Sequence, residues 1–170
     1  MSIWSGLFIA AALLLLNAFF VAAEFSLVSV NRASVEADAE SGSLRASRVR
    51  KLLENLTVYL SGAQFGITVS ALLLGFVAEP TVAKILTGGT SHSGLSVFIA
   101  VVFATSLHLV LGEQIPKYLA LALPRRTAFL LSSLIRIYGK IFFPVVALLN
   151  YCANRILNRL GVEPKSEISA

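Results

Sequence analysis

The stretch IWSGLFIAAALLLLNAFFVAA, residues 3–23, decides the fold class. It contains no Lys, Arg, Asp or Glu, and apolar sequence continues beyond Glu24 to Val30. About 20 apolar residues are enough to span a bilayer as a helix. No basic residue precedes Arg32, and the apolar core is too long for a signal peptide. We therefore expect a transmembrane helix over about residues 3–30.

The composition of the 170-residue chain supports the same class. It is 56% hydrophobic and 14% charged, whereas soluble domains have roughly 45–50% and 25%. Such a chain cannot cover a water-facing surface, which argues against a soluble enzyme or a nucleic-acid-binding module. The net charge is +5, but the basic residues lie around the apolar segments, where membrane topology explains them. The single cysteine, Cys152, allows no internal disulfide and no cysteine-based metal site. We predict an all-α integral membrane protein.

After the first span comes a mixed-charge stretch at 31–57, which is interrupted at Ser41-Gly42-Ser43. The pattern of residues after this interruption predicts a surface helix. Two further apolar segments follow. The second span is expected at about 58–78, ended by Glu79-Pro80 because proline disfavours helical geometry in the residue before it. A turn-rich link at 87–94 leads to the third span, about 95–123, which Gly112-Glu113-Gln114-Ile115-Pro116-Lys117 interrupts.

The distribution of Lys and Arg predicts the orientation. There are none before the first span, five between the first and second, one between the second and third, and eight from Lys117 onward. Because positive charge stays in the cytoplasm, the N-terminus is expected outside and the C-terminus inside. Residues 1–123 would then form a three-span transmembrane domain.

Residues 124–160 admit two interpretations. A fourth span would bury Arg136 and Lys140 at roughly 2.5–3.5 kcal/mol each, whereas a pair of amphipathic helices at the cytoplasmic interface would avoid this cost. We favour the second, a juxtamembrane helical belt. Residues 161–170 have the composition of a linker and suggest that a cytoplasmic domain follows.

In the first span, Asn17 and Glu24 are seven residues apart, about 20° from eclipsed, and so share one face. An intramembrane carboxylate is a candidate functional group. The alternative is that Glu24 lies near the cytoplasmic end and pairs with Arg32 or Lys117.

In the second span, Gly62, Gly66 and Ser70 recur at four-residue spacing, a pattern that lets helices approach closely. Gln64, Thr68 and Ser70 add side-chain oxygens. Packing alone would explain the glycines; oxygen ligands would suit a hard cation.

In the third span, Pro116 has no N–H to donate to the Gly112 carbonyl. Glycine- and proline-interrupted membrane helices point to transporter binding sites, and Glu113 places a carboxylate beside that carbonyl, which suits Mg²⁺ or Ca²⁺. The alternative is a helix end at the interface with Glu113 and Lys117 paired.

Three motifs in order resemble the membrane domain of the CorC / cyclin M magnesium transporters. They are FVAAEFSLVSVNR at 20–32, LSGAQFGITVS at 60–70 and LGEQIPK at 111–117. The resemblance implies a homodimer of three-helix protomers in the plasma (inner) membrane with a cytoplasmic belt. It also implies a following pair of cystathionine-β-synthase-type domains that bind ATP, and Mg²⁺ export with Na⁺ proposed as the counter-ion.

The resemblance also suggests ion ligands. Gly112 and Glu113 match the family's Gly-Glu element, and Ser70 and Thr68 match the polar part of its second helix. Many relatives have serines four apart in the first helix, where this chain has Asn17 and Val21. Ligands from the first span would therefore be the Asn17 amide, a backbone carbonyl near Ala22, or Ser26.

Two functional hypotheses follow. The first is a transporter that exports Mg²⁺. An ion gradient is expected to drive it, because the chain has no phosphate-binding GxxxxGK[ST] motif. The chain contains no HExxH or GxSxG motif that would indicate an enzyme. Its two histidines, His92 and His108, are too far apart for HExxH. The second is a membrane anchor that dimerises cytoplasmic regulatory domains without transporting ions. Polar side chains gathered at one site would favour transport, and polar side chains scattered toward lipid would favour the anchor.

Overall fold

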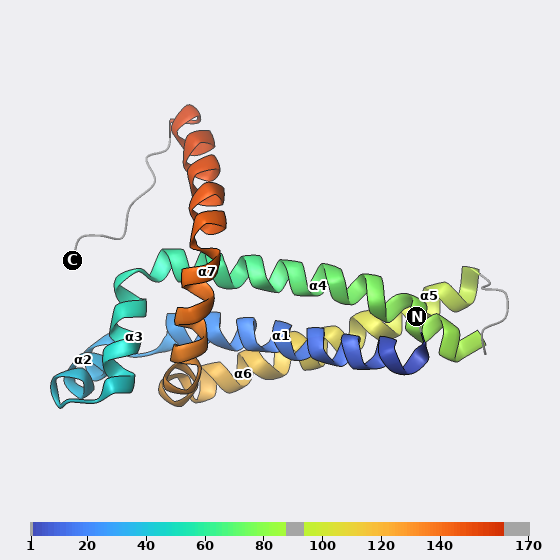
Figure 1. The fold of residues 1–170 in the computed structure, drawn as a ribbon, viewed down its shortest axis with the longest axis horizontal. Coiled ribbons are helices and arrows are strands. Elements are labelled where there is room, and N and C mark those ends of the chain that lie inside the picture. Colours follow the sequence, from blue (N-terminus) through green and yellow to red (C-terminus); the bar gives the residue numbers. More distant parts are fainter. Residues whose placement is uncertain (1, 88–93, 162–170) are drawn as a thin grey trace.

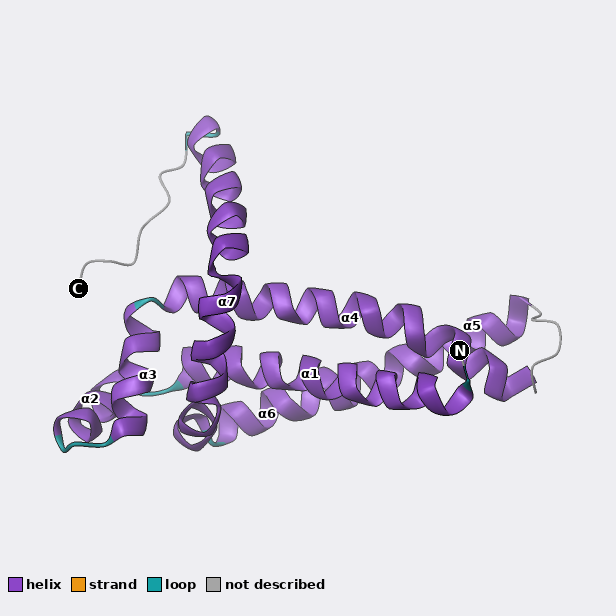
Figure 2. Ribbon diagram, in the orientation of Figure 1, coloured by secondary structure: helices purple, strands orange, loops and turns teal. Residues whose placement is uncertain are grey.

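The computed structural model describes residues 2–87 and 94–161, and every regular element among them is helical (Figure 2). The elements are α1 (Ile3–Ser29), α2 (Arg32–Glu40), α3 (Leu44–Glu54), α4 (Leu56–Thr87), α5 (Gly94–Leu107), the π-helical turn η1 (His108–Gln114), α6 (Ile115–Ala122) and α7 (Pro124–Arg159). Most of the predicted link at 87–94, and the linker beyond residue 161, lie outside the described residues.

The long apolar helices form one elongated bundle. α1 and α4 lie lengthwise beside the continuous series α5, η1 and α6 (Figure 1). α1 packs against α4, η1 and α6, so it is central to the arrangement. Large apolar side chains along the bundle are exposed, for example Trp4 at 81%, Phe8 at 77% and Phe76 at 78%. Such a surface is suited to lipid rather than to water.

Four described helical segments are long and apolar enough to cross a membrane: Ile3–Ser29, Leu56–Ile85, Val97–Ala122 and Pro124–Arg159. The first three correspond to the predicted spans. α7 instead lies crosswise to the bundle at the α2–α3 end before it continues away from it (Figure 1). It is one helix that contains Pro144, so the predicted pair of helices is wrong. An internal proline removes one hydrogen bond and kinks a helix, which is compatible with its continuation.

The predicted end of the second span at Glu79-Pro80 is also wrong, because α4 continues through Pro80 to Thr87. Membrane helices tolerate proline where Ser or Thr side chains satisfy freed backbone groups nearby. Pro80 frees the Phe76 carbonyl, and the hydroxyl of the following Thr81 donates to the neighbouring Val77 carbonyl at 2.6 Å. The proline therefore modifies this helix without ending it.

The largest buried apolar cluster lies where α1 ends and α2, α3 and α7 meet. Its members are Ala23, Leu27, Val30, Val35, Val49, Leu52, Leu53, Ala128 and Ile135. The predicted break at 41–43 is present as a turn, in which Gly42 has a φ of 92° that favours glycine. The predicted surface helix is α3, and it ends at Glu54, just before α4 begins.

Close helix packing at the predicted small-residue face is confirmed at Gly66. A Cβ atom there would lie 2.5 Å from the ring of Phe20, which is 4% exposed. The same ring packs against Tyr138 of α7, with ring centroids 4.6 Å apart. At Gly62 a Cβ would meet only ordinary contacts, but its carbonyl accepts a 3.0 Å hydrogen bond from the Tyr138 hydroxyl. Glycine is therefore required at position 66 and not at 62.

Candidate functional site

The third apolar segment contains a π-helical turn, η1, at the predicted interruption. The amide of Ile115 donates to the Val110 carbonyl, five residues back, instead of four as in an α-helix. Pro116 follows in the first turn of α6 and cannot donate to Gly112. The turn begins at His108, four residues before the expected break. Short π-helical insertions occur frequently at functional sites.

Asn17 and Ser70 meet Gly112 at this turn. The Asn17 amide nitrogen Nδ2 donates to the Gly112 carbonyl at 3.0 Å, and the single proton of the Ser70 hydroxyl is shared between Asn17 Oδ1 at 2.9 Å and the Gly66 carbonyl at 2.7 Å. The carbonyl can only accept, so it is the amide nitrogen of Asn17 that must face it. α1, α4 and η1 are thereby joined by one polar network, which we call the Asn17 network: Asn17, Ser70 and Gly112.

The Asn17 network is fully enclosed. The side chains of Asn17 and Ser70 are each 0% exposed, and Gly112 is buried. A Cβ at Gly112 would lie 2.7 Å from His108 Cδ2 and 3.2 Å from Asn17 Nδ2. A side chain at position 112 would therefore displace the His108 ring and press on Leu14 and Asn17 of α1.

Glu113 does not point into the Asn17 network. Its Oε1 atom lies 3.8 Å from His108 Nε2, and its side chain is 40% exposed. Residues five apart lie about 140° apart on an α-helix, so the π-helical turn is what brings this pair together. His108 is the residue that sequence reasoning missed, since it lacked a recognised motif. Its Nε2 atom is buried without a hydrogen-bond partner, and its ring packs against Gly112.

The other predicted ligands lie elsewhere. Thr68 is exposed and donates to the Gln64 carbonyl of its own helix, on the side of α4 away from Ser70. Ser26 is buried but donates to the Ala23 carbonyl. Ala22 and Ser26 are five and nine residues beyond Asn17 on α1, about 7.5 and 13.5 Å along the helix axis.

The alternative ion pairs considered for the carboxylates are not formed in the described part of the chain. Glu24 makes no ion pair there, and Lys117 lies over the Phe25 ring, with Nζ 4.9 Å from the centroid. Glu113 is placed beside His108 rather than Lys117.

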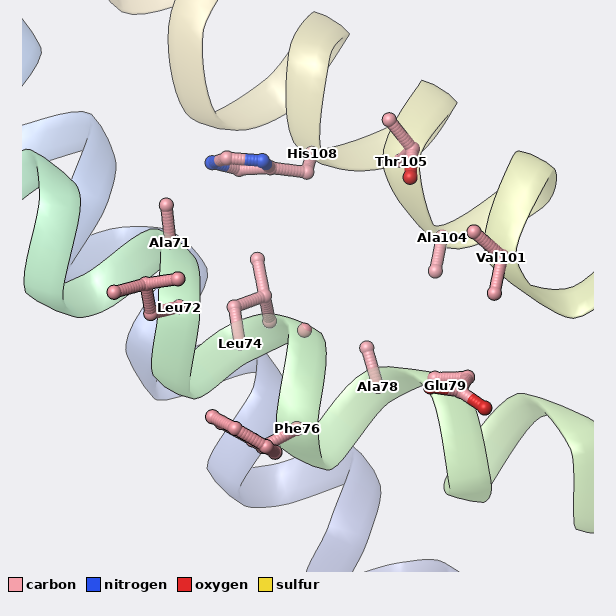
Figure 3. Close-up of a pocket in the computed structure, with 11 residues that line it drawn as sticks. Ala71, Leu72, Leu74, Phe76, Ala78, Glu79, Val101, Ala104, Thr105 and His108 are labelled. Carbon is pink, nitrogen blue, oxygen red and sulfur yellow. The ribbon is translucent and has the colours of Figure 1, made fainter.

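A cavity of about 340 Å³ lies between α4 and the α5–η1 segment, and His108 at its edge also packs against Gly112. Figure 3 shows His108 above Ala71 and Leu74 at one end, with Thr105 and Glu79 toward the other. These three polar residues are set among small and apolar side chains. Asn17, Ser70 and Gly112 do not line this cavity, and His108 is the residue that borders both the cavity and Gly112.

The oxygen atoms gathered in the Asn17 network are Asn17 Oδ1, Ser70 Oγ and the Gly112 carbonyl, whereas the Glu113 carboxylate lies outside it, beside His108. The described residues contain no cluster of three or more His, Cys, Asp or Glu side chains. A cation at this site would therefore rely on neutral oxygens and a single carboxylate, a donor set for a hard cation such as Mg²⁺.

A family model described as the cyclin M transmembrane N-terminal domain matches residues 8–170. The chain belongs to the cyclin M family. The resemblance predicted from the three sequence motifs is thus confirmed, and the chain is a multi-pass membrane protein.

Relatives of the cyclin M chain include bacterial proteins of greater length. It is 44% identical to the uncharacterized protein Rv1841c of Mycobacterium tuberculosis over 99% of this chain and 50% of the relative. It is 36% identical to the UPF0053 protein YrkA of Bacillus subtilis over 95% of this chain and 39% of the relative. The chain spans about half the length, or less, of these relatives.

Proposed function

We propose that the chain is the membrane domain of a secondary transporter that exports Mg²⁺, with a sodium gradient as the driving force. Gly112, Ser70 and Asn17 supply neutral oxygens, and Glu113 supplies the charge. The observation that carries this proposal is the Asn17 network, because buried polar groups from three helices converge where a membrane helix is interrupted.

The cavity bordered by His108 supports the proposal by its size. Mg²⁺ gives up its bound water reluctantly and carries six ligands. Six waters at about 30 Å³ each need about 180 Å³, and the cavity has about 340 Å³. A hydrated ion therefore fits beside the site at which it would exchange water for protein oxygens.

Transport in this proposal takes place in a homodimer with three spans per protomer. The N-terminus lies outside and the C-terminus lies in the cytoplasm, as the distribution of Lys and Arg indicates. α7 lies at the cytoplasmic interface, which keeps Arg136 and Lys140 at headgroup depth. Cystathionine-β-synthase-type domains that bind ATP follow the chain in the full-length protein.

A membrane anchor is the second candidate function. It is favoured by Thr68 and Ser26, which bond to carbonyls of their own helices instead of joining the network. In an anchor, the Asn17 network would serve only to hold α1, α4 and η1 together.

Proteoliposomes loaded with Mg²⁺ separate the two functions. The transporter releases Mg²⁺ from vesicles at a rate that rises with an opposed sodium gradient, and Glu113→Gln abolishes that rate. Thr68→Val is the matched control, since this side chain lies outside the network, and it retains the flux. Vesicles that release no Mg²⁺ under either gradient, with the protein shown to be folded and dimeric, would support the anchor.

A further inference from the structure

A second cavity, of about 290 Å³, lies between α3 and α7 and is basic. It is lined by Arg48 of α3 and by Ser133, Arg136, Ile137 and Lys140 of α7. The four α7 positions have helical spacings of three, four and seven residues, so they form one face of that helix. Neither Asp nor Glu lines this cavity. We call it the basic cavity.

The cations of the basic cavity lack the acidic partners that neighbouring arginines have. Arg50 pairs with Glu36 at 2.8 Å, and Arg125 pairs with Asp38 at 2.6 Å. The hydrogen bond and charge of Glu36 raise the pKa of Arg50 further.

Arg48 instead donates to the neutral Ser133 hydroxyl at 2.6 Å. Arg136 and Lys140 form no ion pair with any residue that the structure describes. Three cationic side chains thus line one cavity, and a bound anion would be attracted by all of them.

An apolar surface adjoins this positive charge. A neighbouring cavity of about 300 Å³ is lined by Asn55, Val58, Tyr59, Gly139, Lys140 and Phe143, and so it shares Lys140 with the basic cavity. On α7, Ile137 is 57% exposed and Ile141 is 64% exposed. A small anion dissolved in water gains nothing from this surface, whereas a molecule with a phosphate and a hydrocarbon chain matches both parts.

We propose that the basic cavity binds the phosphate headgroup of an anionic phospholipid, with an acyl chain along Val58, Tyr59 and Phe143. Guanidinium groups pair with phosphate oxygens through two parallel hydrogen bonds, and basic pockets between membrane-protein helices bind lipid headgroups. The site explains why Arg136 and Lys140 occur in the largely apolar middle of α7. It is separate from the Asn17 network and does not depend on ion transport.

Native mass spectrometry of the detergent-purified chain tests the proposal. The protein is mixed with equal amounts of phosphatidylglycerol and phosphatidylcholine, and the retained lipid is measured. Wild type is expected to retain phosphatidylglycerol preferentially. Each cation near an anionic headgroup contributes about a five-fold preference, so Arg136→Gln with Lys140→Gln lowers that preference by roughly 25-fold. Both side chains are exposed, so the variant is expected to fold.

Arg155→Gln with Arg159→Gln is the matched control, because it removes the same charge from α7 away from the cavity. It should retain the preference. An equal loss in this control, or no preference in the wild type, would overturn the proposal. A further arm adds excess inorganic phosphate: lipid retention unchanged by phosphate supports a lipid site, whereas complete displacement would identify a free-phosphate site instead.

Discussion

The side-chain amide of Asn17 donates to the carbonyl of Gly112, 95 residues further along the chain, at 3.0 Å. This hydrogen bond supplies the donor that Pro116 cannot. The interruption of the third span at Gly112 and the polar residue Asn17 of the first span are thus joined by one hydrogen bond. The same hydrogen bond determines what substitutions at Asn17 should do.

Asn17→Leu is expected to destabilise the protein. It leaves the buried Gly112 carbonyl without its donor, which costs about 1–3 kcal/mol. Asn17→Asp is expected to destabilise it more, because a carboxylate would face a carbonyl oxygen. Under the proposed function, Mg²⁺ should restore the aspartate variant and not the leucine variant. Thermal unfolding in detergent, with and without Mg²⁺, measures both effects; an aspartate variant that Mg²⁺ leaves unchanged would contradict a cation role for Asn17.

Glu113→Gln should weaken Mg²⁺ binding severely while the protein still folds, since it retains size and one acceptor oxygen but loses the charge. Glu113→Asp retracts the carboxylate by about one methylene and should lose Mg²⁺ more than Ca²⁺, because octahedral Mg²⁺ tolerates misplacement less well. Ser70→Ala should have a milder effect, with Thr81→Val as its control on the same helix. Titration calorimetry on size-checked protein gives the affinities. If Glu113→Gln binds Mg²⁺ with wild-type affinity, Glu113 is not a ligand of the ion.

Gly66→Ala and Gly75→Ala are a matched pair on α4. The added methyl at 66 overlaps the buried ring of Phe20 and should cost about 1–3 kcal/mol. At 75 it meets nothing within 4 Å, so the higher helix propensity of alanine should leave stability unchanged or raise it by up to about 1 kcal/mol. The midpoints of thermal unfolding should separate accordingly. Equal effects at the two positions would show that Phe20 yields to the methyl group.

The orientation can be tested by single-cysteine labelling of intact cells in a background without Cys152. A cysteine at position 91 should react with an impermeant reagent, and one at position 47 should not, because the five basic residues between the first two spans are expected inside. Labelling at 47 and protection at 91 would reverse the topology.

Much of the fold follows from the sequence because hydropathy fixes where helices begin and how long they are. The predicted end of the second helix at Pro80 and the predicted pair of helices after Pro124 were wrong. The effect of a proline depends on whether neighbouring groups satisfy the backbone carbonyl that it frees. At the site, Asn17, Ser70 and Gly112 were all predicted, but their mutual hydrogen bonds were not. The pairing of His108 with Glu113 was missed because α-helical spacing separates them, and only a π-helical turn places them on one side.

Tyr138 connects α7 to the helix bundle. The Tyr138 hydroxyl bonds to the Gly62 carbonyl, and its ring rests on Phe20, which fills the space left by Gly66. Gly66 in turn accepts a hydrogen bond from Ser70 at 2.7 Å. A displacement of α7 could therefore be transmitted to the buried Ser70 through only three residues: Tyr138, Phe20 and Gly66. In a longer protein, a load on the far end of α7 would act as on a lever whose fulcrum is the bundle.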